Sequence, residues 1–236
     1  MKGTKITIET YDEVHDIEEQ IHDLQFQIRY VPIKVFVNGE QYTQKDFEGV
    51  RKIGETEEAN YYIQNDYDFS SLYNRGIYVK SIEPQTISFA VVSKKALKLN
   101  FARNDVIESD ETWQKLKANL TNTFYKWIGE NSSKLGAGEK DSAFQFVTRS
   151  VSEKDIPLII NAKIIKTPGH NYVSLAEISQ KKILFNNNGR IADELFTRGI
   201  IVLPEANYRI NKLLFFIPHK IVTIEQLLRE KVLPDL

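Results

Sequence analysis

The sequence predicts an α+β protein, with a β-α-β sheet domain followed by a smaller α/β module. Short apolar or alternating runs, separated by polar turn residues, indicate strands in the first half. The segment 110–128 places Trp113, Leu116, Leu120 and Phe124 along one helical face, which is typical of a helix packed on a sheet. In the second half, short buried runs alternate with helical patterns, and this alternation favours a small parallel or mixed sheet.

The first half is expected to open with a strand, a helix and a hairpin. Apolar residues recur at helical spacing from Val14 through Ile21 to Leu24. Asn38 and Gly39 supply the positive backbone dihedral angles of a tight type I′ turn. We expect strands at residues 5–9, 26–30, 33–37, 40–42, 73–79 and 88–92.

The second half is expected to begin after a linker. Residues 129–142 are rich in glycine, serine and charge, so the predicted units are domains 1–128 and 143–236, joined by the linker 129–142. Asn186 to Gly189 is interpreted as a turn that tolerates left-handed backbone. Thr223 and Gln226 form a capping box for a last helix, which Pro234 stops. We expect strands at 183–185, 200–203 and 213–217, and helices near 191–196 and 206–211.

Composition narrows the class of protein. The chain has 236 residues, 42% of them hydrophobic, and can bury a sizeable core. Its 31 lysines and arginines balance 32 acids, which argues against nonspecific binding to nucleic acid or membranes. The absence of cysteine excludes disulfides and thiolate chemistry. Neither an apolar signal core nor a run of about 20 apolar residues occurs, so we expect a cytoplasmic protein without a membrane contact.

Searches for catalytic and metal-binding motifs give little. The histidines at 15, 22, 170 and 219 lack the spacing of a metal site, and no metal is expected. Asp66 and Asp68 fit a solvated turn, because a calcium loop needs more carboxylates and a glycine. The sequence contains no P-loop, no GxGxxG, no GxSxG and no kinase signature.

The most informative stretch is LNFARND, residues 99–105. Leu97, Leu99 and Phe101 alternate with polar residues like the end of a strand, and Arg103 follows just before the long helix. A guanidinium at a helix N-terminus would favour a phosphate. The other interpretation is a surface ion pair of Arg103 with Asp105 or Glu108. The candidate N-caps of the helix are Asn104, Asp105 and Asp110.

Three motifs in the first half carry a family resemblance. They are Gly3-Thr4 followed by KITIE, LYNRGIYVKSI at 72–82, and LNFARND. In order and approximate spacing, residues 3–128 resemble the middle, or transducer, region of GHKL-type ATPases, especially the ninety-kilodalton heat-shock chaperones. The resemblance implies a transducer-like fold for this region.

The resemblance also implies roles for individual residues. Arg103 stands at the place of a family arginine that reaches the terminal phosphate of ATP, which makes it the candidate catalytic residue. Ala102 and Asn104 depart from the family pattern, which has serine and glutamate. Mismatch-repair and type II topoisomerase members use a transducer lysine instead, for which this chain offers Lys94 and Lys95. The implied nucleotide-binding residues are therefore Thr4, Asn104, Lys94 and Lys95.

The remaining motifs of a GHKL nucleotide site do not occur in this sequence. We therefore expect a fragment that is inactive alone and that uses ATP and magnesium only with an N-terminal ATPase domain joined in cis. A homodimer is a further candidate assembly. One alternative is a non-enzymatic interaction or scaffold module. Another is a nucleic-acid-associated module, whose candidate basic residues are Lys163, Lys166, Lys181, Lys182 and Arg190.

Overall fold

The computed structural model describes residues 17–43, 46, 48–64, 69–82 and 86–229, and within these ranges the fold is α+β. The first half contains α1 (Ile17–Ile28), β1 (Phe36–Val37), β2 (Glu40–Gln41), β3 (Val50–Glu55), β4 (Ala59–Gln64), β5 (Ser70–Asn74), β6 (Ile77–Ile82), β7 (Phe89–Ser93) and α2 (Glu111–Asn131). The second half contains α3 (Ala137–Ser150), α4 (Ile156–Ile159), β8 (Ile165–Lys166), β9 (Tyr172–Val173), α5 (Leu175–Gln180), β10 (Lys182–Phe185), α6 (Gly189–Thr197), β11 (Ile200–Leu203), α7 (Tyr208–Leu214), β12 (Lys220–Ile221) and α8 (Ile224–Arg229).

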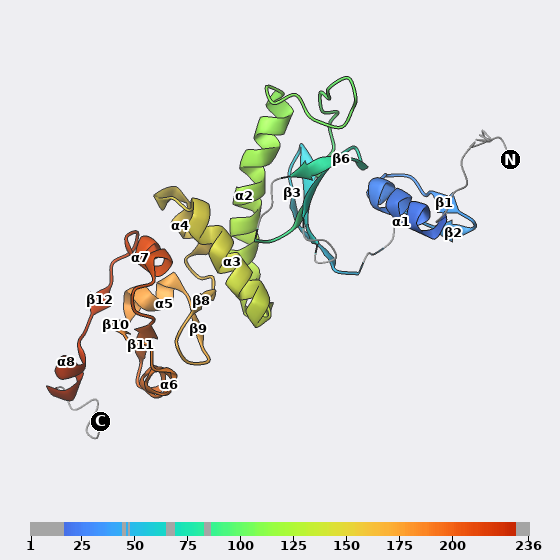
Figure 1. Cartoon of the computed structure of the whole chain (residues 1–236). Helices are drawn as coiled ribbons and strands as arrows, with labels where there is room; N and C mark the ends of the chain where they lie inside the picture. Colours follow the sequence, from blue (N-terminus) through green and yellow to red (C-terminus); the bar gives the residue numbers. More distant parts are fainter. Residues whose placement is uncertain (1–16, 44–45, 47, 65–68, 83–85, 230–236) are drawn as a thin grey trace.

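A five-stranded sheet forms the centre of the first half, in the order β3-β4-β7-β5-β6. Its pairs are antiparallel except β5 with β7, which is parallel. Helix α2 covers one face and α1 the other (Figure 1). Strand β4 shows why both faces are apolar, because Tyr61 and Ile63 belong to the core under α2 while Tyr62 packs in the aromatic cluster under α1.

The turn between β5 and β6 is a tight hairpin against the end of α1. Arg75 and Gly76 have φ angles of 54° and 91°, and a Cβ on Gly76 would lie 2.3 Å from the carbonyl oxygen of Tyr30. Only glycine fits that approach. The single strand predicted over residues 73–79 is therefore wrong, since the Arg75-Gly76 turn divides it.

Helix α2 joins the sheet to the second half. The predicted stripe is confirmed for Trp113, Leu116 and Phe124, which are buried, while Leu120 is partly buried against the same core. The rings of Phe89 in β7 and Phe124 in α2 lie 5.4 Å apart, and the ring of Phe146 in α3 lies 4.7 Å from that of Phe124. One aromatic cluster thus connects the sheet, α2 and α3.

Residues 129–142 do not form the irregular linker that their composition predicts. They contain the last turn of α2, a short 3₁₀ turn and the first turns of α3. The hydroxyl of Ser132 accepts a hydrogen bond from the amide of Lys163 at 3.0 Å, and Glu139 pairs with Arg51 at 2.6 Å. Capping by the Glu139 carboxylate at Gly136 explains why a glycine-rich stretch can start a helix. The division into two domains at this stretch stays a prediction.

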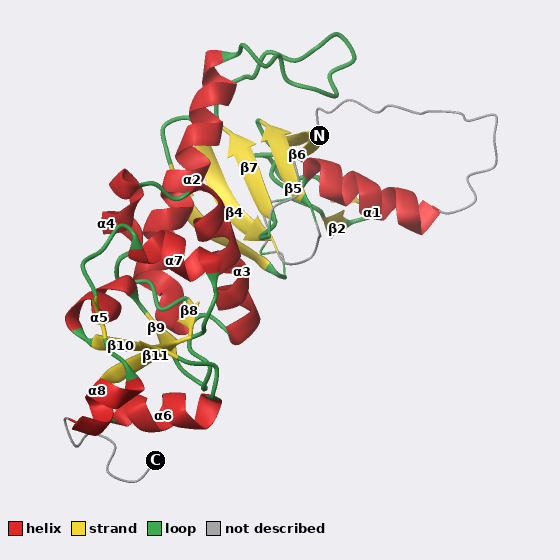
Figure 2. Ribbon diagram, turned by 60° about the vertical axis from the view of Figure 1, so that its left-hand side comes forward, coloured by secondary structure: helices red, strands yellow, loops and turns green. Residues whose placement is uncertain are grey.

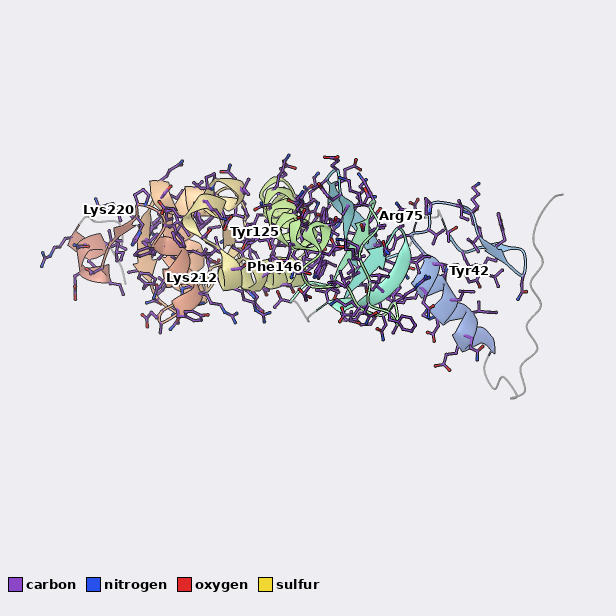
Figure 3. The ribbon with its side chains drawn as sticks, turned by 90° about the horizontal axis from the view of Figure 1, so that it is seen from above. Tyr42, Arg75, Tyr125, Phe146, Lys212 and Lys220 are labelled. Atoms are coloured by element: carbon purple, nitrogen blue, oxygen red, sulfur yellow. The ribbon has the colours of Figure 1, made fainter. Side chains whose placement is uncertain are left out.

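The second half contains a three-stranded parallel sheet in the order β11-β10-β12, as its alternating pattern predicts. Helix α7 packs on one face, with Ile183 and Ile201, and α6 packs on the other, with Leu184 and Val202. Helices α3, α4 and α7 lie between the two sheets (Figure 2). Seen from above, the described elements follow one another along the molecule, from Tyr42 past Arg75 and Phe146 to Lys220 (Figure 3).

Several boundaries differ from the prediction for local reasons. The strand predicted at 26–30 is the end of α1, where Phe26 packs on the sheet as a helical residue. The strand predicted at 213–217 belongs to the end of α7 and its following turn, and the third strand is β12. Strands β3 and β4 were not predicted. Asn38 and Gly39 form the expected turn, with φ angles of 51° and 88°. The strand predicted at 5–9 lies outside the described residues.

Candidate functional site

Residues 97–107 form a short hairpin between β7 and α2. Leu99 and Val106 are paired in an antiparallel bridge, and the amide of Ile107 donates to the carbonyl of Lys98 at 2.9 Å. The predicted strand end at 97–101 is thus only a bridge. The loop that carries residues 94–110 extends beyond the first turn of α2 (Figures 1 and 2). Arg103 is at the tip of this hairpin.

The tip of the hairpin is closed by hydrogen bonds to and from Asn100. Its carbonyl accepts from the amide of Arg103 at 3.0 Å, and its side-chain oxygen accepts from the amide of Asn104 at 3.2 Å. The Asn100 side-chain nitrogen donates to the Asn104 side-chain oxygen at 2.8 Å. Asn104, a predicted nucleotide-binding residue, therefore uses its oxygen inside the turn. Arg103 has a φ of 57°, a conformation that this network holds in place.

Carboxylates fix the base of the hairpin. Asp105 accepts from the ammonium of Lys80 at 2.5 Å, and Glu108 accepts from Lys117 at 3.0 Å. The bonds from Lys80 and from the Val106 amide hold the pKa of Asp105 below its usual range. Bonds from Lys117, and then from the indole of Trp113, lower the pKa of Glu108 in the same way.

These pairs leave Arg103 without an acid. Its side chain is exposed, and within the described ranges no carboxylate or carbonyl accepts a hydrogen bond from it. The surface pair with Asp105 or Glu108, which the sequence left open, is replaced by the pairs of those acids with lysines. Phe101, two residues earlier, is also fully exposed at the tip.

The start of α2 does not provide the anion site that the sequence predicts. Asp110 is the N-cap, and its carboxylate accepts from the amides of Thr112 at 2.7 Å and Trp113 at 3.3 Å. It also accepts from the amide of Lys98 at 2.6 Å. The protein's own carboxylate thus occupies the place of a bound anion, and Arg103 lies away from the cap in sequence. Burial opposes ionisation of Asp110, but the three amide bonds keep its pKa below the usual range.

The two runner-up lysines are paired near the end of β7. Lys94 donates to the carbonyl of Thr56 at 2.7 Å and lies 3.4 Å from Glu55, while Lys95 lies 3.2 Å from Glu57. Both are solvent-exposed pairs of the kind that contribute little to stability. Thr4 lies outside the described residues.

The other sequence candidates do not converge on one site. Lys163 pairs with Glu177 at 3.0 Å, and the ring of Phe196 lies under the ammonium of Lys181. His22 and His170 are exposed, and His219 contacts the carbonyl of Ile217. Asp66 and Asp68 lie outside the described residues. Among the described residues, no group of three histidine or acidic side chains could hold a metal ion.

Sequence reasoning missed the contacts that position Arg103. The ion pair of Lys80 with Asp105 joins β6 to the hairpin, and no local pattern indicates a pair across that separation. The signal for Asn100 was present, since an asparagine in a turn often bonds the backbone.

Comparison with known proteins does not assign the chain to a family. No protein-family model matches the chain, and no curated protein matches it. In the part of the chain that the structure describes, no helix has the length and apolar character to cross a membrane.

Proposed function

We propose that this chain is the transducer-like region and adjoining α/β module of a GHKL-type ATP-binding protein. In this proposal an ATPase domain joined in cis at the N-terminal side holds ATP and magnesium, and the chain senses the nucleotide state. Arg103 is the residue that reaches the terminal phosphate. The observation that carries the proposal is the exposed guanidinium of Arg103, which has no partner among the described residues and lies at the tip of a hairpin whose base is fixed by ion pairs and hydrogen bonds.

The order of three motifs supports the family, and the geometry favours Arg103 over the lysines. A side chain that contacts a phosphate in a neighbouring domain should not form an ion pair within its own domain. Arg103 meets this condition among the described residues, whereas Lys94 and Lys95 are paired with acids. Arg103 also suits a phosphate chemically, because a guanidinium forms bidentate hydrogen bonds with phosphate oxygens. Holding the rest of the nucleotide requires residues beyond this chain.

The test is ATP turnover by the protein together with its ATPase domain. We expect Arg103→Ala to lower turnover by about 10- to 1000-fold, since one charge-stabilising group in phosphoryl transfer contributes that much. Nucleotide affinity should change less, because the contact forms fully only after domain closure. Lys94→Ala and Lys95→Ala are the matched controls and should be close to wild type.

Two results would contradict the proposal. If a lysine variant loses turnover while Arg103→Ala keeps it, the mismatch-repair-like assignment replaces the chaperone-like one. If the coding sequence upstream of Met1 lacks the remaining motifs of a GHKL nucleotide site, the proposal is wrong and an interaction module takes its place.

A further inference from the structure

The carboxyl ends of β10 and β11 lie at the same edge of the small sheet because the two strands are parallel. Residues 186–188 follow β10, and residues 204–207 follow β11. The side-chain oxygen of Asn187 accepts from the amide of Glu205 at 3.0 Å, so the two loops are joined. Ligands of open α/β sheets bind outside this edge of the strands.

The asparagines of these two loops use their side-chain oxygens in the same way. In each, the side-chain oxygen accepts a hydrogen bond from a backbone amide, as it does in Asn186, Asn187, Asn188 and Asn207. A backbone N–H can only donate, so the atom facing it must be the oxygen. Each side-chain NH₂ group is therefore left as a donor, and within the described ranges none of the four has an acceptor.

A cavity of about 330 Å³ opens beside the second of these loops, whose Pro204 and Asn207 line it. Apolar side chains form most of its wall, namely Phe144, Ile164, Pro168, Pro204 and Ile210. Asn207, Thr167, Lys166 and Asp141 supply the polar part of the lining. Such a mostly apolar hollow with a few polar groups is the usual form of a small-molecule site, at the lower end of the usual size range.

The acid in the cavity is already engaged. Asp141 accepts from the hydroxyl of Tyr172 at 2.9 Å, and the ammonium of Lys166 lies 3.9 Å from its other oxygen. Burial, together with the neighbouring Asp141, raises the pKa of Tyr172 to about 12, so its hydroxyl keeps the proton that it donates. Lys166 is loosely paired and remains partly exposed, so its ammonium can turn to a ligand.

Charged side chains of both signs surround this edge of the sheet. Arg190 and Arg209 follow the asparagine caps and have no acid partner among the described residues. Of the acids, Asp193 accepts from the amide of His170 at 3.0 Å, whereas Glu205 is exposed. The free groups are mainly N–H donors.

We propose that the cavity beside residues 204–207 binds a small organic anion, with an apolar body against the cavity wall and a carboxylate or phosphate group on the side-chain NH₂ of Asn207 and the ammonium of Lys166. The site is separate from the Arg103 hairpin and does not depend on the function proposed for it. Neutral amide donors and one ammonium bind an oxyanion through direct hydrogen bonds. The apolar wall adds affinity for a ring.

Titration of the chain with phenyl phosphate, followed by the NMR signals of the asparagine side-chain amides, tests the proposal. We expect saturable shifts of the Asn207 NH₂ signals at millimolar concentrations or below. Inorganic phosphate should bind about 10-fold more weakly, because it leaves the apolar wall uncovered. Benzoate should compete with phenyl phosphate, because its carboxylate can accept from the same donors.

Asn207→Asp is the decisive variant. Its carboxylate still accepts from the amides of Arg209 and Ile210, so α7 stays capped, but the donor is replaced by a negative charge. We expect at least a 10-fold loss of phenyl phosphate binding with an unchanged melting temperature. Asn122→Asp, on the exposed side of α2, makes the same charge change and should bind normally. Equal binding by Asn207→Asp and wild type would overturn the proposal, as would the absence of saturable shifts in the wild-type chain.

Discussion

Two loop regions of this molecule are held by different chemistry. The base of the hairpin 97–107 is fixed by carboxylates, since Asp110 accepts from backbone amides and Asp105 pairs with Lys80. The edge of the small sheet is fixed by the neutral side chains of asparagines, such as Asn187 and Asn207. In the hairpin, lysines pair with Asp105 and Glu108, and the guanidinium of Arg103 has no partner among the described residues. At the sheet edge, backbone amides donate to the side-chain oxygens of the asparagines, whose NH₂ groups have no acceptor in the described part of the chain.

The largest difference in stability should come from Asp110→Ala. The substitution removes the cap of α2 and the acceptor of the Lys98 amide together, and the expected loss is about 2 to 3 kcal/mol. Denaturant titration of both proteins measures it. Asp110→Asn keeps an acceptor for the helix and should lose less. If Asp110→Ala unfolds at the wild-type midpoint, carboxylates do not hold the hairpin in the way described.

A smaller loss is expected for Asn207→Ala at the other region. It removes the side-chain acceptor at the start of α7 and should cost about 1 kcal/mol. Asn207→Asp should restore the loss, since aspartate caps as well as asparagine. A loss in both variants would mean that the side-chain nitrogen also stabilises the fold, contrary to its lack of a partner in the described chain.

Lowering the pH should destabilise the hairpin before it destabilises the edge of the small sheet. The pKa of Asp110 is lowered in the folded protein, so its contribution is fully present above the unfolded value of about 3.9 and is lost as pH falls through the folded value. The asparagine caps do not titrate. We therefore expect hairpin amides to lose protection, relative to intrinsic exchange at the same pH, below about pH 4 before those of α6 and α7 do. In Asp110→Asn, the difference between the regions should shrink.

The smallest effect is expected for Lys80→Ala. The ion pair of Lys80 with Asp105 is at the surface, and such pairs contribute about 1 kcal/mol or less. Salt should reduce the remaining contribution by screening. The denaturation midpoints of wild type and variant are compared over a range of salt concentrations. If both shift equally with salt, this ion pair does not stabilise the hairpin.

Sequence periodicity predicted the elements that bury one clear stripe or run. Helix α2 belongs here because its apolar residues repeat at helical spacing, and strands β10 and β11 because each is a short continuous apolar run. Strand β4 was not predicted because its aromatic residues alternate between two covered faces, as Tyr61 and Tyr62 show. Strand β3 was not predicted because it is mostly polar and exposed, with only Ile53 buried. Residues 129–142 are largely helical although their composition favours an irregular stretch, because capping by Glu139 and the long-range contacts of Ser132 and Glu139 order them.

The candidate site was predictable in part. Arg103 could be selected from its motif, but its position at a hairpin tip could not. The N-cap of α2 had three candidates in sequence, and only tertiary contacts made Asp110 the one used, since its second oxygen also bonds the amide of Lys98. The pairing of Lys94 and Lys95 with acids likewise depends on the turn between β3 and β4.

The contact of Phe89, Phe124 and Phe146 has a mechanical consequence. Three rings packed edge to face at 4.7 to 5.4 Å leave little room for sliding between the sheet, α2 and α3. Lys212 of α7 extends the same connection, because its ammonium donates to the carbonyls of Thr148 and Arg149 at the end of α3. A force applied at the hairpin would therefore turn α2 and α3 together as a lever, with the small sheet carried at its far end.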